Sequence, residues 1–189
     1  MRTPITVACL PISALLALGA CGADPVSYST PVGIELKAKS SEVANSTVSD
    51  DKAITTESGN PYGAFVNDAQ AKLGKSPTSI EIDTLTLSLG AQSTGVNALD
   101  QIFTGDVDVA LITNDTNNTY DVGHVMNPTG VGPVGVDVGF QSAQVSQADF
   151  AKILSGSFKV VVRGPAAATF QGKGADASLQ LTFTFAAFE

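Results

Sequence analysis

Residues 179–185 read Leu-Gln-Leu-Thr-Phe-Thr-Phe, with an apolar side chain at every odd position and a polar one at every even position. In a β-strand successive side chains point to opposite faces, so this alternation produces one apolar and one polar face. A similar period of two recurs at residues 107–111, 134–140 and 158–162. We therefore expect antiparallel β-structure in which each strand buries one face.

The pattern changes phase within residues 80–89. Ile80 and Ile82 fall at even positions, but the three leucines that follow fall at odd positions. A regular strand would place the two groups on opposite faces. Both groups reach the core only if an extra residue forms a bulge near Asp83 and Thr84, or if the strand passes from one sheet to the next.

Three short helices are expected between the strands, as connections that plug the ends of the domain. Each is preceded by a side chain that can accept a hydrogen bond from the first free backbone amides, and is followed by apolar residues at helical spacing. The residues that mark their ends are Asn60 with Pro61 and Gly74, Ser146 with Asp149 and Gly156, and Asn97 with Asp100.

These segments predict an all-β, mainly antiparallel fold, an immunoglobulin-like β-sandwich of about seven strands with two or three short connecting helices. The strands are expected at residues 32–37, 80–89, 107–111, 122–126, 134–140, 158–162 and 179–185. A small β-barrel is the alternative, because periodicity does not separate the two architectures. The polar residues 40–59 predict a long loop or a poorly paired edge strand.

The N-terminus has the features of an export signal. Arg2 precedes an apolar run that contains Pro11 and falls short of the roughly twenty residues that a membrane-spanning helix needs. The run ends in Leu-Gly-Ala-Cys at residues 18–21. This segment resembles the signal peptide and lipobox of bacterial lipoprotein precursors. The resemblance implies cleavage before Cys21, whose thiol carries a diacylglyceryl group, so that acyl chains such as palmitate anchor the protein in a membrane.

The chain is accordingly divided into a lipoprotein signal peptide (1–20), a lipidated cysteine with a flexible tether (21–31) and a single β-sandwich domain (32–189). The tether assignment depends on prolines and small polar residues, which do not build a core. Gly22 stands where an Asp would mark inner-membrane retention in enterobacteria, so the resemblance favours the outer membrane. The membrane face, periplasmic or surface, stays open.

Charge and cysteine content fit an exported protein. The formal net charge is −8, and loss of Arg2 with the signal takes it to about −9. Such an acidic surface repels nucleic acid and anionic headgroups, so no nucleic-acid partner is expected. Cys9 leaves with the signal, and we expect a mature domain that folds by core packing, without a disulfide, metal or other cofactor.

Catalytic residue types are scarce. His124 is the only imidazole, and the chain has no G-x-S-x-G motif for a serine nucleophile. Asp106 and Asp108 share one strand face, as do Glu81 and Asp83, at a spacing of roughly 6.5–7 Å that suits a glycosidase pair. Carboxylates on a solvated strand face usually serve solubility, and the chain has no Trp to stack on a sugar ring. We therefore predict no enzymatic activity.

A glycine motif resembles a nucleotide-binding loop only in its letters. Gly130, Gly132 and Gly135 match G-x-G-x-x-G, but such a loop must open a helix whose amides face the phosphates. Here Pro133 removes an amide, and an alternating, strand-like segment follows. The glycines instead predict a turn or bulge.

The polar loop from Asn114 to Asp121 is the one candidate metal site. Asp115, Asn117 and Asp121 offer the hard oxygen ligands that calcium prefers. The loop lacks both the glycine and the bidentate glutamate of the helix-loop-helix calcium motif, and strands flank it. Asn and Asp are also the residues that hairpin loops prefer, because they tolerate left-handed backbone conformations. No metal is therefore assigned, and calcium is kept only as the weaker alternative at these three residues.

The sequence thus predicts a membrane-anchored extracytoplasmic lipoprotein that acts as a non-catalytic interaction or structural module of the cell envelope. Acyl chains on Cys21 would hold it to the membrane, and its loops and exposed strand edges would contact an envelope protein or glycan. The alternative function is a calcium-dependent small-ligand or glycan-binding lipoprotein that uses the loop from Asn114 to Asp121.

Overall fold

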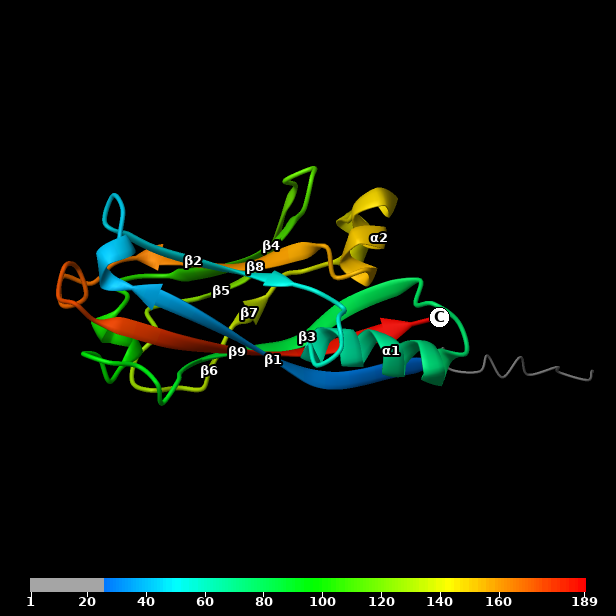
Figure 1. Ribbon diagram of the computed structural model, residues 1–189, viewed down its shortest axis with the longest axis horizontal. Coiled ribbons are helices and arrows are strands. Elements are labelled where there is room, and N and C mark those ends of the chain that lie inside the picture. The colour runs from blue at the N-terminus through cyan, green and yellow to red at the C-terminus, as the bar shows by residue number, and fades with distance from the viewer. Residues whose placement is uncertain (1–25) are drawn as a thin grey trace, which may run out of the picture.

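The computed structural model describes residues 26–189, which form two antiparallel sheets packed face to face (Figure 1). The first sheet has the order β1-β9-β3-β6 and the second the order β2-β8-β4-β5-β7. The first contains β1 (Ser27–Lys39), β9 (Asp176–Phe188), β3 (Ser79–Leu89) and β6 (Val134–Gly135); the second contains β2 (Thr47–Ile54), β8 (Phe158–Pro165), β4 (Val107–Thr113), β5 (Thr119–Val125) and β7 (Asp137–Val138).

This architecture confirms the predicted all-β sandwich. The described residues build two separate sheets with free edges instead of one closed barrel. Nine strands are present where about seven were expected, because one predicted strand divides and the polar region before residue 60 contains another. The apolar face of β9, with Leu179, Leu181, Phe183 and Phe185, is buried at the centre of the core.

The phase change in β3 is a bulge, as predicted. The pairing of β3 with β9 shifts register between Ile82 and Thr84. Asp83 is the extra residue, and it is exposed. As a result Ile80, Ile82, Leu85 and Leu87 all point into the core although they fall on both parities.

The predicted strand at residues 134–140 is two short strands in different sheets. Val134 and Gly135 pair with β3, whereas Asp137 and Val138 pair with β5. Val136 lies buried at the crossing, and its amide donates to the Leu85 carbonyl at 2.9 Å. The apolar and polar residues alternate as the sequence indicates, but the segment is not one strand. The chain steps from one sheet to the other here and closes this side of the sandwich.

Two of the three predicted helices form with the expected ends. α1 (Pro61–Leu73) starts after Asn60, whose side chain accepts the Tyr62 amide, and stops at Gly74 with φ 72°. α2 (Gln147–Leu154) starts after Ser146, whose hydroxyl accepts the Asp149 amide. The third is a single 3-10 turn, η2 (Leu99–Gln101), without a side-chain cap. There the Asn97 amide donates to the Gln101 side chain, so Asn97 does not act as the predicted cap.

α1 closes one end of the sandwich. The ring of Tyr62 lies edge-on to those of Phe158 and Phe185, with centroid separations of 5.1 and 5.3 Å, so it contacts both sheets. Its hydroxyl donates to the Ile153 carbonyl at 3.0 Å, which joins α1 to α2. Burial of Tyr62 raises the pKa of this hydroxyl, which therefore stays a neutral donor.

The first strand starts earlier than predicted. Residues 27–31 belong to β1 and pair with residues 184–188 of β9, although we had placed them in the flexible tether. β1 is an edge strand, and an edge tolerates Pro31 because the missing amide leaves no partner unpaired. The prolines that suggested a tether are therefore compatible with a strand.

Residues 40–59 form an edge strand and not a long loop. β2 follows a 3-10 turn, η1 (Ser40–Glu42), and pairs with β8 without interruption. The prediction of poor pairing was wrong because β2 gains its hydrogen bonds from β8, more than one hundred residues away in sequence. The other 3-10 turn, η3 (Ser142–Gln144), contacts β3 through hydrogen bonds from Ser142 to Glu81.

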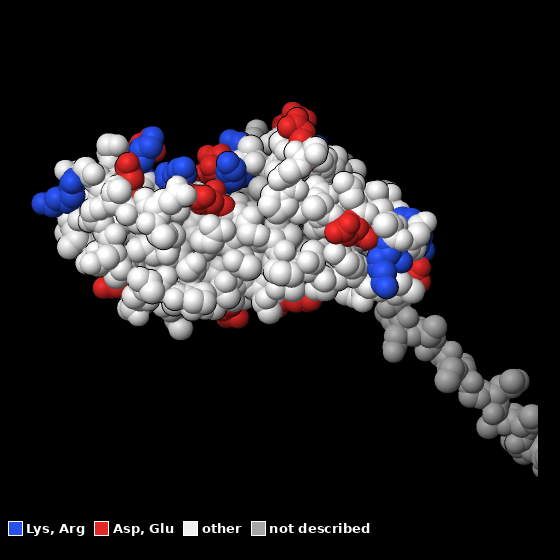
Figure 2. Space-filling model, turned by 60° about the horizontal axis from the view of Figure 1, so that its bottom comes forward, with Lys and Arg blue, Asp and Glu red and all other residues white. Residues whose placement is uncertain are grey.

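The outer face of the first sheet is rich in hydroxyl groups. Thr84 and Thr184 lie side by side in the sheet and share a hydrogen bond of 2.7 Å, and Thr86 lies beside Thr182. Figure 2, in which the bottom of Figure 1 comes forward, shows little charge across the middle of the visible face and charges of both signs along its upper rim. Charged side chains are thus concentrated at the edges of this face.

Candidate functional site

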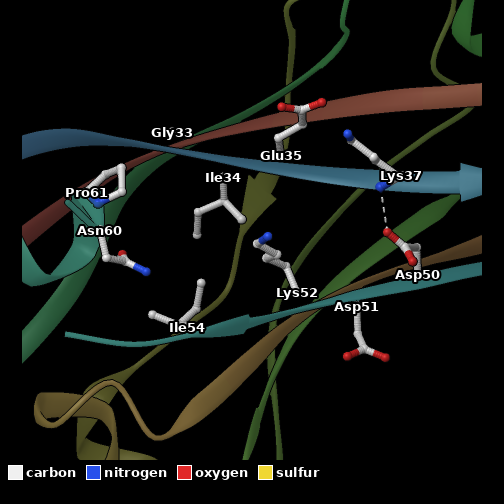
Figure 3. A pocket seen from close by; sticks show the side chains of 10 residues that line it. All are labelled: Gly33, Ile34, Glu35, Lys37, Asp50, Asp51, Lys52, Ile54, Asn60 and Pro61. Carbon is white, nitrogen blue, oxygen red and sulfur yellow. Dashed lines mark hydrogen bonds between the residues drawn. The ribbon is translucent and has the colours of Figure 1, made fainter. Parts of the chain in front are cut away.

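A groove of about 450 Å³ lies on the open side of the sandwich, between β1 of one sheet and β2 of the other (Figure 3). Ile34 and Ile54 face each other across it, and Asn60 and Pro61 at the start of α1 lie at one end. The chain crosses from β1 to β2 through η1 beyond the opposite end. The groove is therefore a short slot between two edge strands.

One wall of the groove is the free edge of β1, which pairs only with β9. The amide of Lys37 donates to Asp50 Oδ2 at 2.7 Å, so this amide points away from β9. The direction of backbone groups alternates along a strand, and Gly33 and Glu35 therefore present their N–H and C=O groups to the same edge. Pro31 has the same parity, which places its missing amide at the edge as well.

The opposite wall carries charges that point inward. Val48 and Ile54 are buried core residues of β2. Asp50 and Lys52 lie at alternate positions between them, so their side chains leave the strand on the same side. Figure 3 shows Lys52 pointing into the groove and Asp51 pointing away from it. Inward charges on an edge strand oppose uncontrolled strand pairing.

These charges differ in how they are satisfied. Asp50 is bound to the Lys37 amide, and Asp51 pairs outside the groove with Lys159 at 3.2 Å. Lys52 makes no ion pair with any carboxylate of residues 26–189. The groove thus combines a free stretch of backbone, an apolar floor and one lysine that points inward and has no ion pair within the described residues.

A second polar cluster surrounds Asp149 in α2, whose side chain is only 1% exposed. Its carboxylate accepts hydrogen bonds from Thr116 (2.8 Å), Asn118 (2.7 Å), Tyr120 (2.8 Å) and Ser146 (3.1 Å), and pairs with Lys152 at 3.3 Å. The hydrogen bonds from Asn118 and Tyr120, foremost, hold the pKa of the carboxyl well below its usual value. Both oxygens are occupied, so this carboxylate serves to fix α2 to the loop between β4 and β5.

The structure does not gather the candidate calcium ligands. Asp115 and Asn117 lie in the turn between β4 and β5 with φ of 67° and 53°, the left-handed conformation that these residue types tolerate. Asp121 lies within β5, about 10 Å along the strand from that turn at 3.4 Å per residue. No cluster of three acidic, histidine or cysteine side chains suited to a metal occurs among residues 26–189.

The structure places neither of the two carboxylate pairs as predicted, although His124 has a carboxylate in register on each side. His124 is exposed on the outer face of the second sheet, in register with Asp108 on one side and Asp137 on the other. Asp106 precedes β4 and does not belong to the strand that carries Asp108. Glu81 accepts hydrogen bonds from Ser142, whereas Asp83 lies in the bulge.

The glycine motif forms a turn, as predicted. Gly130 and Gly132 adopt φ of 66° and 78°, and Gly135 lies in β6. A side chain at Gly132 would lie within 2.7 Å of the Leu87 carbonyl oxygen, so the glycine permits a close approach to β3. No helix follows the motif, and a nucleotide site has no structural counterpart here.

Sequence reasoning missed the groove and the Asp149 cluster. The groove had a signal, because polar Asp50 and Lys52 interrupt the alternation between Val48 and Ile54. Asp149 was predicted only as a local cap, since its contacts with Thr116, Asn118 and Tyr120 span about thirty residues. Cys21, the predicted lipidation site, lies outside the described residues.

The comparisons with protein families and curated proteins identify no relative of this chain. Within residues 26–189 no helix is long and apolar enough to cross a bilayer. The groove between β1 and β2 is therefore the candidate site on its geometry alone. No protein-family model matches the chain, and no curated protein shows significant similarity to it.

Proposed function

We propose that this chain is a lipid-anchored, non-catalytic interaction module of the cell envelope. The observation that carries the proposal is the asymmetry of the sandwich. One side is closed where residues 134–138 step between the sheets, and the other is open along β1 and β2. A rigid domain with one accessible strand edge suits recognition of a partner.

The anchor is Cys21, on the strength of the lipobox. Acyl chains hold such a protein to the membrane by burying methylene groups at roughly 0.8 kcal/mol each. Because β1 starts at Ser27, the distance from Cys21 to the domain is at most about 20 Å at 3.3–3.6 Å per residue. The domain would stand close to the membrane, with the outer membrane favoured by Gly22.

The arrangement of polar groups supports a non-catalytic role. His124 is exposed on a sheet face, and the oxygens of Asp149 are saturated by five donors. The alternative function, a calcium-dependent binder, gains no support, since Asp115 and Asp121 do not meet. A protein partner in the envelope is the form of the proposal that the strand edge favours.

In-cell cross-linking tests this function. A C-terminally tagged chain is cross-linked in its native cells, beside the same chain with Cys21→Ser, and both are fractionated and purified through the tag. We expect the original chain in the membrane fraction with one abundant envelope partner, and the variant in the soluble fraction without that partner. A variant that stays in the membrane contradicts the anchor, and failure of the original chain to capture any partner contradicts the interaction module.

A further inference from the structure

The free edge of β1 and the unpaired Lys52 lie in the same groove. Gly33 and Glu35 turn their backbone groups to the edge, and Lys52 points into the space that a further strand would occupy. Main-chain hydrogen bonds to an edge strand provide affinity in strand addition, and alternate side chains of the added segment provide specificity. The groove thus offers both parts of this mode of recognition.

We propose that the groove binds an extended peptide segment as a short strand beside β1, with a carboxylate of that segment paired to Lys52. This inference rests on the proposed function and names the partner chemistry of the same site. Ile34 and Ile54 would contact apolar side chains of the segment that lie on the same face of the added strand as its carboxylate, toward the second sheet. An acidic side chain fits best because Lys52 points into the groove and has no ion-pair partner within the described chain, whereas Lys37, which also lines the groove without an ion pair, points away from it.

The groove limits the length of the segment. At one end Asp50 already occupies the Lys37 amide, and at the other Pro31 offers no amide. Only Gly33 and Glu35 remain as edge-facing donors between these two positions. The bound stretch therefore spans about five residues of β1.

A second copy of this domain fits less well than a flexible segment. The free backbone lies between two sheets, with the start of α1 at one end and the β1–β2 crossing beyond the other. An extended chain can enter such a slot, whereas the edge of another rigid sandwich would meet α1 and β2 before it reached Gly33. We therefore assign the groove to a peptide and not to self-association.

Nuclear magnetic resonance titration of the domain tests the inference with defined probes. The blocked peptide acetyl-Thr-Val-Thr-Glu-Thr-amide, which places Val and Glu on one face of a strand, is compared with versions that carry Gln or Lys in place of Glu. We expect saturable shifts of the Gly33 and Glu35 amides with the Glu peptide, and binding with the Gln peptide that is weaker by up to roughly fivefold, the effect of one exposed ion pair. The Lys peptide should bind more weakly still.

Matched variants separate the groove from general electrostatics. Lys52→Gln should weaken binding of the Glu peptide as much as replacing its glutamate does. Lys173→Gln removes an equal charge from an exposed residue between β8 and β9, outside the groove and without an ion pair, and should leave binding unchanged. Equal affinity for the Glu and Lys peptides, shifts centred away from Gly33, no saturable shift, or a concentration-dependent dimer that blocks the groove would each overturn the inference.

The outcome is distinguishable from that of the cross-linking experiment. If the tagged chain with Lys52→Glu still captures its envelope partner, the interaction module stands and the groove is not its site. If the Glu peptide binds as expected but the native chain captures nothing, the groove is a peptide site and the proposed function is wrong.

Discussion

Asp149 illustrates how a locally readable residue acquires a role from distant ones. Ser146 and Asp149 predicted a helix start, and that start forms. The structure adds Thr116 and Asn118 from the turn between β4 and β5 and Tyr120 from β5, which turns a capping residue into a buried, fully bonded carboxylate. Buried charges are tolerated when each oxygen is paired, and removal of such a group leaves its donors without partners.

This cluster predicts a specific pH dependence of stability. The pKa of Asp149 is depressed in the folded protein, so its contribution is fully present above the unfolded value of about 4 and is lost as the pH falls below it toward the folded value. Asp149→Asn should lower the melting temperature by several degrees at neutral pH. The difference from the original protein should shrink as the pH falls below about 4.

Melting temperatures measured by circular dichroism from neutral pH to about pH 2 check this prediction. Asp115→Asn is the matched control, because this carboxylate lies in the turn between β4 and β5 that contacts Asp149, but is itself exposed. Its melting curve should follow that of the original protein throughout. Parallel pH profiles for the Asp149 variant and the original protein would show that the carboxylate is not the pH-sensitive group.

At the scale of elements, the strands show what alternation can and cannot predict. In β3 the change of phase indicated a bulge, and the pairing with β9 shifts at that place. In residues 134–140 the same kind of alternation was read as one strand, but the chain changes sheets at Val136. Periodicity indicates which side chains are buried. It is the same whether the segment stays in one sheet or crosses between two, because the apolar side chains are buried between the sheets in both arrangements.

The bulge in β3 predicts opposite results for two single-residue deletions. Deleting Asp83 restores a continuous alternation from Ile80 to Leu87, so the core residues keep their face and the domain should fold with a loss below about 1 kcal/mol. Deleting Thr86 turns Leu87 to the solvent face if the bulge is kept, and turns Leu85 to the solvent face and Thr84 into the core if the bulge is lost. This deletion should cost more than about 3 kcal/mol, the value of a buried aliphatic side chain together with a misplaced polar one.

Urea unfolding of the two deletion variants beside the original domain gives both free energies of unfolding. Equal losses for the two would mean that β3 does not depend on face alternation. A severe loss on deletion of Asp83 would mean that the bulge itself is required, for example through the hydrogen bond from Ser29 to Asp83.

At the scale of the whole molecule, the start of β1 sets where the domain begins. The predicted boundary at Val32 cuts through a strand that pairs with β9 over its entire length. Tyr28 also stacks on Phe65 of α1, with ring centroids 6.2 Å apart. If Cys21 carries the proposed lipid, the tether would be correspondingly shorter, and the groove would stand nearer the membrane.

Truncated domains test this boundary. A chain that starts at Val32 loses the β1 residues that pair with the end of β9, and we expect a loss of about 2 kcal/mol, or roughly 4–8 °C in melting temperature for a domain of this size. A chain that starts at Val26 should have the same melting temperature as one that starts at Gly22. Calorimetry of the three chains measures this directly, and equal melting temperatures for all three would restore the boundary at Val32.

The sequence by itself determined the fold class, the helix ends at Asn60, Gly74 and Ser146, and the bulge at Asp83. These features depend on side-chain periodicity and on hydrogen bonds within a few residues, which are local properties of a chain. It also carries the only basis for the lipid anchor at Cys21.

Only the tertiary structure decided the strand order, the sheet change at Val136, the Asp149 cluster and the groove beside β1. Each of these brings together residues far apart in sequence, and local pattern does not specify which strand pairs with which. Asp50 and Lys52 show the division clearly. The sequence shows two polar residues at strand positions that alternate with core residues. That they line a groove follows only from the free edge of β1, which lies in the other sheet.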